Sequence, residues 1–168
     1  LIRHHLSATA RLPIALAARG FSSVAIEGFV KVKDLPRCER VPLVLIVDDE
    51  PEIGEELLDW LDATGIPGLT VTSAADALRT LEEYPSIRVM LTDFKMPHQD
   101  GLALLVEANS ILPKTRVLHF IVMTGHLTEE SIQRISSGKA SAVLPKPLDI
   151  DCLTPLINSL LSKSEGTQ

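Results

Sequence analysis

The segment VMLTDFKMPHQDG, at residues 89–101, decides the fold of this chain. An apolar run of strand type, residues 87–91, leads to the carboxylate of Asp93 and stops at a turn-forming stretch with Pro97 and Gly101. We therefore expect Asp93 to lie at the mouth of a buried strand, where a carboxylate is placed for chemistry. Taken alone, Asp93 is read more simply as a strand end or a loop cap, so other segments must decide.

A second apolar run, residues 43–47, ends in the acids Asp48, Asp49 and Glu50. It is too short for a membrane helix, and the proline that follows, Pro51, suits the first turn of a helix. The pattern predicts a second buried strand that exposes carboxylates at its C-terminal end.

Two further strand-like runs end in a hydroxyl and in a cation. Residues 117–123 lead to Thr124, and residues 142–144 lead to Lys146, which stands between two prolines. In a parallel sheet the C-terminal ends of the strands lie along one edge, where open α/β folds bind ligands. We therefore expect five side chains to converge there: Asp48, Asp49, Asp93, Thr124 and Lys146.

The residue types at this edge indicate a metal and a phosphoryl group. Three carboxylates that meet repel one another unless a cation lies among them, and an oxygen-only set with room for waters suits Mg²⁺. A hydroxyl and an ammonium opposite the acids suit phosphoryl oxygens.

From about residue 42 to residue 161 the chain resembles a response-regulator receiver domain of two-component signalling. The resemblance rests on the acid pair Asp48-Asp49, on Asp93 in the pattern D-x-x-M-P-x-x-D-G, on Thr124 in MTG and on Lys146 in LPKP. It implies an α/β fold: a flavodoxin-like, doubly wound, five-stranded parallel sheet with strand order 2-1-3-4-5 and helices on both faces.

The resemblance also implies a function. A sensor histidine kinase or a phosphotransfer protein would donate a phosphoryl group to Asp93, and Thr124 and Lys146 would contact its oxygens. The protein would be a signalling domain, not an enzyme beyond its own phosphorylation and dephosphorylation. The implied Mg²⁺ ligands are the side chains of Asp48, Asp49 and Asp93 and the backbone carbonyl of Lys95.

In the family, a downstream protein binds the face formed by helix 4, strand 5 and helix 5, and an aromatic residue couples the site to that face. Here Val143 stands at the aromatic position, so the coupling is expected to be weaker or carried differently. Lys95 and His126 occupy positions that in the family flank the path of water to the acyl phosphate.

Two alternatives stay open. A phosphatase of the haloacid dehalogenase type also uses a strand-end Asp, Mg²⁺, a Thr and a Lys, but it needs a second Asp where this chain has Lys95. A degenerate receiver that acts as a constitutive interaction module lacks one or more site residues, whereas all of them are present here.

Charge divides the chain into an extension and a domain. Residues 1–40 carry seven Lys/Arg and three Asp/Glu, while residues 41–168 carry nine and nineteen. We expect 1–40 to be a disordered or non-native extension, with a partly helical arm or a targeting segment as alternatives. Residues 41–162 would form the receiver domain and 163–168 a polar tail, with no output domain in the chain.

The same composition excludes several classes of partner. An acidic domain offers no electrostatic footprint for nucleic acid, and no segment approaches the 18 apolar residues of a membrane span. Two cysteines without metal or redox spacing, Cys38 and Cys152, favour a reducing, cytoplasmic setting.

Helical periodicity fills the intervals between the strands. In the helix that Asp100 and Gly101 open, Leu102, Leu105 and Val106 are expected to face the core. The helix after Thr128 offers only Ile132 and Ile135 as strong apolar positions, so we expect it to pack weakly.

Overall fold

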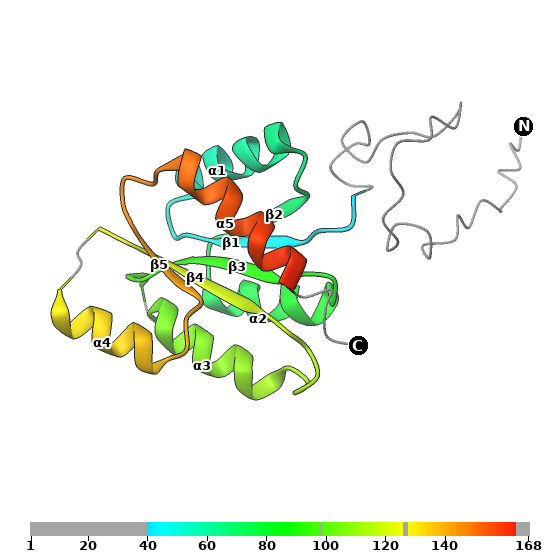
Figure 1. The fold of residues 1–168 in the computed structure, drawn as a ribbon. Coiled ribbons are helices and arrows are strands. Elements are labelled where there is room, and N and C mark those ends of the chain that lie inside the picture. The colour runs from blue at the N-terminus through cyan, green and yellow to red at the C-terminus, as the bar shows by residue number, and fades with distance from the viewer. Residues whose placement is uncertain (1–39, 98, 126–127, 164–168) are drawn as a thin grey trace, which may run out of the picture. The chain divides into compact units, whose positions relative to one another are not determined.

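The computed structural model describes residues 40–97, 99–125 and 128–163 of the 168-residue chain. Within them five strands alternate with five helices (Figure 1). The strands are β1 (Val44–Val47), β2 (Gly68–Val71), β3 (Val89–Asp93), β4 (His119–Thr124) and β5 (Ala142–Pro145). The helices are α1 (Pro51–Thr64), α2 (Ala74–Glu83), α3 (Gly101–Ile111), α4 (Glu129–Ser137) and α5 (Ile150–Lys163).

The strands form one sheet in the order β2-β1-β3-β4-β5, and every neighbouring pair is parallel. The doubly wound fold expected from the sequence is therefore confirmed. β4 starts at His119, later than the apolar run suggested, because the chain first makes a turn in which the Arg116 N–H donates to the carbonyl of Pro113.

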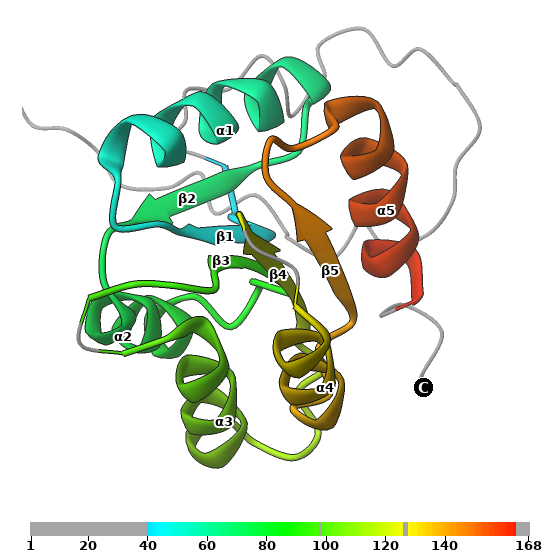
Figure 2. The same ribbon diagram turned by 90° about the vertical axis from the view of Figure 1, so that its left-hand side faces the viewer.

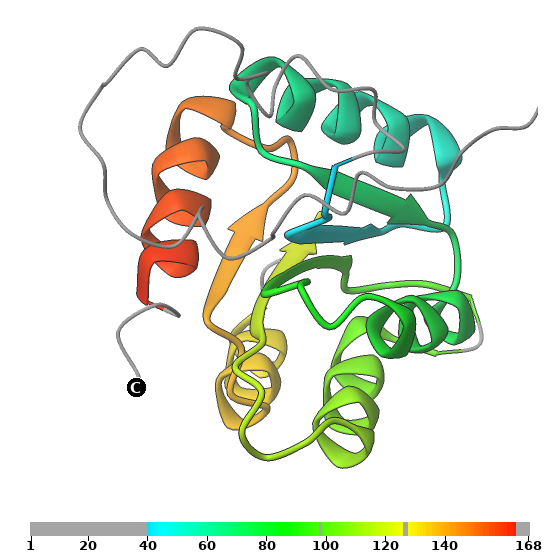
Figure 3. The same ribbon diagram turned by 90° about the vertical axis from the view of Figure 1, so that its right-hand side faces the viewer.

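The alternation of side chains along each strand supplies two core layers. In β1, Val44 and Ile46 pack with α1 and α5, whereas Leu45 and Val47 pack with α2 and α3. Figures 2 and 3 show α1 and α5 on one face of the sheet and α2, α3 and α4 on the other. Each fully buried side chain of this kind contributes about 1.5–3 kcal/mol, so both layers hold the strand ends in place.

Local signals set the ends of the helices. Pro51 begins α1, and Gly65 ends it with φ 79°, a left-handed conformation that glycine adopts at little cost. Ser73 caps α2, since its hydroxyl oxygen accepts from the Asp76 N–H at 3.1 Å. Asp100 caps α3, accepting from the Ala103 N–H at 2.7 Å.

The buried side of α3 corrects one expectation. Val106 is 61% exposed, and the fully buried side chains of this helix include Leu104 and Ala108. A buried stripe at 101, 104, 105 and 108 places residue 106 about 100° away from 105 around the helix, outside the core. In α4, Ile135 is buried and Ile132 is 45% exposed, which agrees with weak packing.

The chain is already packed at Arg40, which the sequence had assigned to the extension. Its guanidinium lies 2.8 Å from Asp62 Oδ1 of α1, and both side chains are mostly buried. The expectations for residues 1–39, His126 and residues 164–168 lie outside the described residues. None of the described helices is long and apolar enough to cross a membrane.

Candidate functional site at the carboxyl edge of the sheet

Asp93 is the last residue of β3, which lies between β1 and β4 in the middle of the sheet. The residue is 7% exposed. Its Oδ2 accepts a 2.8 Å hydrogen bond from the backbone N–H of Lys95, while the side chain of Lys95 is exposed. The turn after β3 therefore fixes Oδ2 of Asp93, while Oδ1 can contact residues from other strands.

Asp48 follows β1 directly and is 1% exposed. Its Oδ1 accepts from the backbone N–H of Glu50 at 3.1 Å, so the carboxylate is held by the turn that leads into α1. Asp49, the next residue, is half-buried. The register of β1 against β3, in which Val47 pairs with Thr92, brings Asp48 and Asp93 to the same edge of the sheet.

Lys146 joins these two carboxylates. Its Nζ lies 2.9 Å from Asp48 Oδ2 and 2.8 Å from Asp93 Oδ1. Burial by itself acts to lower the pKa of the Lys146 ammonium, but the hydrogen bonds to Asp93 and Asp48 outweigh it, and the pKa is raised. The ammonium therefore stays charged at neutral pH, and it offsets part of the charge of two nearly buried acids.

Thr124 ends β4 and is 2% exposed. Asp93 pairs with Met123, so Thr124 lies one residue further along the neighbouring strand. The backbone N–H of Lys146 donates to the carbonyl of Thr124 at 2.8 Å, which ties the loop after β5 to the end of β4. The Lys146–Pro147 peptide bond in this loop is cis.

The structure thus brings Asp48, Asp93 and Lys146 into direct contact and sets Asp49 and Thr124 beside them. Among the described residues, no three His, Cys, Asp or Glu side chains lie close enough together to hold a metal ion. The Lys146 ammonium lies between the carboxylates of Asp48 and Asp93.

The donor set nevertheless fits Mg²⁺. This ion prefers oxygen ligands, keeps several waters and is usually bound by one or two carboxylates, so it does not require a three-acid cage. Asp49 and Asp93 supply two carboxylates at the edge, Asp48 a third, and the Lys95 carbonyl lies in the turn after β3.

A second group of contacts next to the site was not expected from the sequence. The guanidinium of Arg134, on α4, lies 3.0 Å from Asp100 Oδ2 and 5.7 Å from the ring centre of Phe94. Phe94 immediately follows Asp93, and its carbonyl accepts from the Gly101 N–H at 3.1 Å. Arg134 therefore connects α4 to the residue next to the buried acid and to the cap of α3.

The start of α3 is packed tightly against Asp93. A Cβ atom at Gly101 would clash with the carbonyl oxygen of Asp93 and would lie 3.0 Å from the side chain of Thr92. Only glycine fits this close approach of two backbone segments. The D-x-x-M-P-x-x-D-G pattern contained this glycine, but its spacing alone could not reveal the contact.

Fold and site together define a doubly wound α/β domain with an acidic edge that a lysine bridges. The sequence model of the response regulator receiver domain matches residues 44–158, more than half of the chain. The chain belongs to this family, which is a family of signalling domains in two-component systems.

Individual proteins that resemble this chain are also response regulators. The DNA-binding transcriptional regulator NtrC of Escherichia coli K12 is 32% identical over 126 residues, which cover 75% of this chain and 26% of NtrC. The two-component response regulator PprB of Pseudomonas aeruginosa is 26% identical over 105 residues, 62% of this chain and 38% of PprB. The chain thus spans about a quarter of NtrC and little more than a third of PprB.

Solved structures show the same fold. A response regulator receiver domain from Clostridium thermocellum superposes with a TM-score of 0.66 at 31% identity, over 74% of this chain and 97% of that one. A CheY-like receiver domain protein from Methanospirillum hungatei gives a TM-score of 0.67 at 26% identity, with the same two coverages.

Proposed function

We propose that Asp93 accepts a phosphoryl group from the phosphohistidine of a sensor histidine kinase or phosphotransfer protein. The observation that carries the proposal is the double contact of the Lys146 ammonium with Asp48 and Asp93. The nearly buried carboxylate of Asp93 can act as the nucleophile, and the Lys146 ammonium, 2.8 Å away, can stabilise the negative charge of the incoming phosphoryl group.

In this proposal a carboxylate oxygen of Asp93 attacks phosphorus and the P–N bond to the donor histidine breaks. The bonding electrons leave with the imidazole, which then takes a proton. The backbone N–H of Lys95 holds Oδ2 of Asp93 and the Lys146 ammonium holds Oδ1, so the two contacts fix the orientation of the carboxylate. Lys146 stays paired with the aspartyl group or with a phosphoryl oxygen, and the Thr124 hydroxyl binds another.

The implied metal would be held by Asp49 and Asp93, by Asp48 through water, and by the carbonyl of Lys95. When bound, Mg²⁺ neutralises charge on the transferring group. The structural support for this assignment is the oxygen-only donor set at the edge.

Phosphorylation adds about two negative charges, and it changes the protein only if two arrangements of the surrounding loops bind the phosphoryl group with different affinities. We propose that the change reaches a downstream protein through the face formed by α4, β5 and α5. Val143, which lies in β5, replaces the usual aromatic residue, so contacts from α4 carry more of the coupling. The contact of Arg134 with the ring of Phe94 joins α4 to the residue next to Asp93, so it can carry this coupling.

Intact-mass measurement after incubation with acetyl phosphate and Mg²⁺ tests the proposal. We expect one added phosphoryl group on the parent and on Asp100→Ala, and none on Asp93→Ala. Asp100 is the matched control because it is an acid of the same segment that serves as the cap of α3. An adduct that persists in Asp93→Ala would refute the assignment of Asp93.

Two other outcomes would favour other functions. Failure of the parent to take up phosphate with Mg²⁺ present would favour a constitutive interaction module. Multiple-turnover hydrolysis of a phosphate monoester would favour a phosphatase of the haloacid dehalogenase type.

A further inference from the structure

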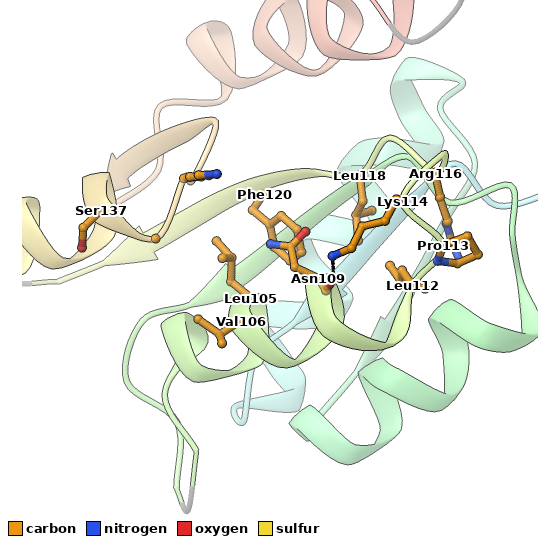
Figure 4. Close-up of a pocket in the computed structure, with 12 residues that line it drawn as sticks. Leu105, Val106, Asn109, Leu112, Pro113, Lys114, Arg116, Leu118, Phe120 and Ser137 are labelled. Atoms are coloured by element: carbon orange, nitrogen blue, oxygen red, sulfur yellow. Dashed lines mark hydrogen bonds between the residues drawn. The ribbon is translucent and has the colours of Figure 1, made fainter.

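A cavity of about 440 Å³ lies on the α3 and α4 side of the sheet, away from the acidic edge (Figure 4). Its walls come from α3, from the loop between α3 and β4, from the first residues of β4 and from the carboxyl end of α4. This volume is within the range of about 300–1,000 Å³ that is usual for small-molecule sites.

The inner wall of the cavity is apolar. Leu105 of α3 and Phe120 of β4 are almost completely buried, and Leu112, at the end of α3, is 9% exposed. Leu118 completes this wall and is half-buried. Because Leu105 and Phe120 are almost completely buried, most of the hydrophobic surface open to a ligand comes from Leu118 and from Val106, which also lines the cavity and is 61% exposed.

Cations dominate the polar part of the lining. Lys114, Arg116 and Lys139 line the cavity, which makes three of the nine Lys/Arg in residues 41–168. None of the nineteen Asp/Glu in the same residues lines it. In a domain with twice as many acids as bases, this concentration of positive charge indicates an anionic occupant.

Arg116 holds a charge that the described residues do not neutralise. Its guanidinium donates to the carbonyl oxygens of Leu81, Tyr84 and Ile87, and no carboxylate of the described residues lies within ion-pair distance. Its Nε is buried and has no hydrogen-bond partner there. Burial lowers the pKa of Arg116, as expected for a cation without an acidic partner.

Lys139 lines the cavity and has an unfavourable backbone conformation. Its φ is 64°, in the left-handed region that costs an L-residue other than Gly, Asn or Asp roughly 1 kcal/mol or more. Within the described residues, Lys114 donates to the carbonyl of Asn109 at 3.4 Å (Figure 4). Both lysine side chains are exposed, so their ammonium groups can reach a ligand.

We propose that this cavity binds a small amphiphilic carboxylate, whose charged head pairs with Lys114 and Lys139 in the positive field of Arg116, while its apolar body lies against Val106, Leu112 and Leu118. The site is separate from the acidic edge. Phe120 lies four residues before Thr124 on β4, a distance of roughly 13 Å along the strand. A ligand in the cavity leaves Asp93 accessible, so the inference does not depend on the proposed phosphorylation.

Titration of the full chain with octanoate, followed by amide chemical shifts in NMR spectra, tests the proposal. We expect shifts centred on the cavity residues and a dissociation constant that is roughly millimolar or lower. Octanamide, which has the same apolar body without the charge, should bind about threefold to tenfold more weakly.

The double variant Lys114→Gln/Lys139→Asn removes both exposed cations while keeping a residue that tolerates φ 64° at position 139. The double variant should bind octanoate about threefold to tenfold more weakly than the parent does, and it should bind octanamide as the parent does. Lys163→Gln, which changes an exposed lysine outside the cavity, should bind octanoate like the parent. If the double variant unfolds, the octanoate affinity of Lys114→Gln alone is compared with that of the parent.

The proposal would be overturned by no binding of octanoate, by shifts centred away from the cavity, or by equal binding of octanoate by the parent and by the lysine variants. Equal affinity of the parent for octanoate and octanamide would also overturn it, because the cavity would then be merely apolar.

Discussion

Lys146 Nζ lies 2.8 Å from Asp93 Oδ1, and the same ammonium lies 2.9 Å from Asp48 Oδ2. One cation from the loop after β5 thereby offsets two carboxylates that end two other strands. Removing one partner of a buried charge group leaves the others uncompensated, which costs more than the pairing itself contributes.

We therefore expect Lys146→Met to lower the free energy of unfolding by about 1–3 kcal/mol at pH 7, less than for a fully buried group because the Lys146 side chain is 23% exposed. Urea denaturation with a chelator present measures it. Adding Mg²⁺ should recover part of the loss, because a second cation can replace the ammonium between the acids. Lys163→Met is the control and should change the free energy of unfolding by less than about 0.5 kcal/mol. An equal loss of stability in both variants would show that Lys146 does not stabilise the fold by compensating Asp48 and Asp93.

Gly101→Ala should destabilise the fold by about 1–3 kcal/mol, because the new methyl group meets the backbone carbonyl of Asp93. Gly125→Ala is the matched control, since a Cβ there has no atom within 4 Å. Thermal or urea unfolding of the two variants distinguishes them. Similar stabilities would mean that the start of α3 can shift away from Asp93.

The stability of the domain should depend on pH through His119. Burial, followed by the charges of Lys163 and Arg88, lowers the pKa of His119 below its usual value near 6.5. The unfolded chain then binds a proton more readily, so this contribution to stability is complete above pH 6.5 and is lost as the pH falls below it. We expect His119→Gln to lose less stability than the parent between pH 7 and pH 5.5; parallel pH profiles would show that His119 does not contribute.

If Asp93 is phosphorylated as proposed, the exposed side chain of Lys95 can lie against the phosphoryl oxygens and occupy the path of the attacking water. We expect Lys95→Ala to dephosphorylate roughly twofold to fivefold faster, with Lys163→Ala unchanged. The decay of the phosphorylated mass with time measures the rate. A slower variant would instead show that the cation stabilises the transition state, and an equal rate would make Lys95 an ordinary surface lysine.

Residues 1–39 should be dispensable for folding, because the α/β pattern is complete without them. The deletion should begin after residue 39, since Arg40 packs against Asp62. We expect the unfolding midpoint to change by less than about 4 °C, the smallest shift that corresponds to 1 kcal/mol in a domain of this size. A larger fall would show that the extension contributes to the packed structure.

The strand ends that form the site could be read from the sequence because β1 and β3 are buried on both faces. Such strands give continuous apolar runs, and the first acid that interrupts each run, Asp48 after β1 and Asp93 as the last residue of β3, marks the end of the strand. The order of the strands came from the family resemblance, since periodicity contains no information about which strands are neighbours.

Other contacts have no periodic signature. Arg116 binds carbonyls 29–35 residues away, and Arg134 reaches Asp100 34 residues away, so neither partner can be inferred from local spacing. The inward face of α3 was misjudged at Val106 because the helix is apolar on several sides, with Leu102, Leu104, Leu105 and Val106 in close succession.

In the described part of the chain, α4 is held by few contacts. Among its side chains in the described part of the chain, Ile135 alone is buried, and the exposed ion pair of Arg134 with Asp100 together with its contact over Phe94 adds only about 1–2 kcal/mol. An equilibrium between two positions of this helix would shift tenfold for every 1.4 kcal/mol of preference. If Asp93 is phosphorylated as proposed, a charge on the residue next to Phe94 needs to alter only one or two contacts to shift such an equilibrium.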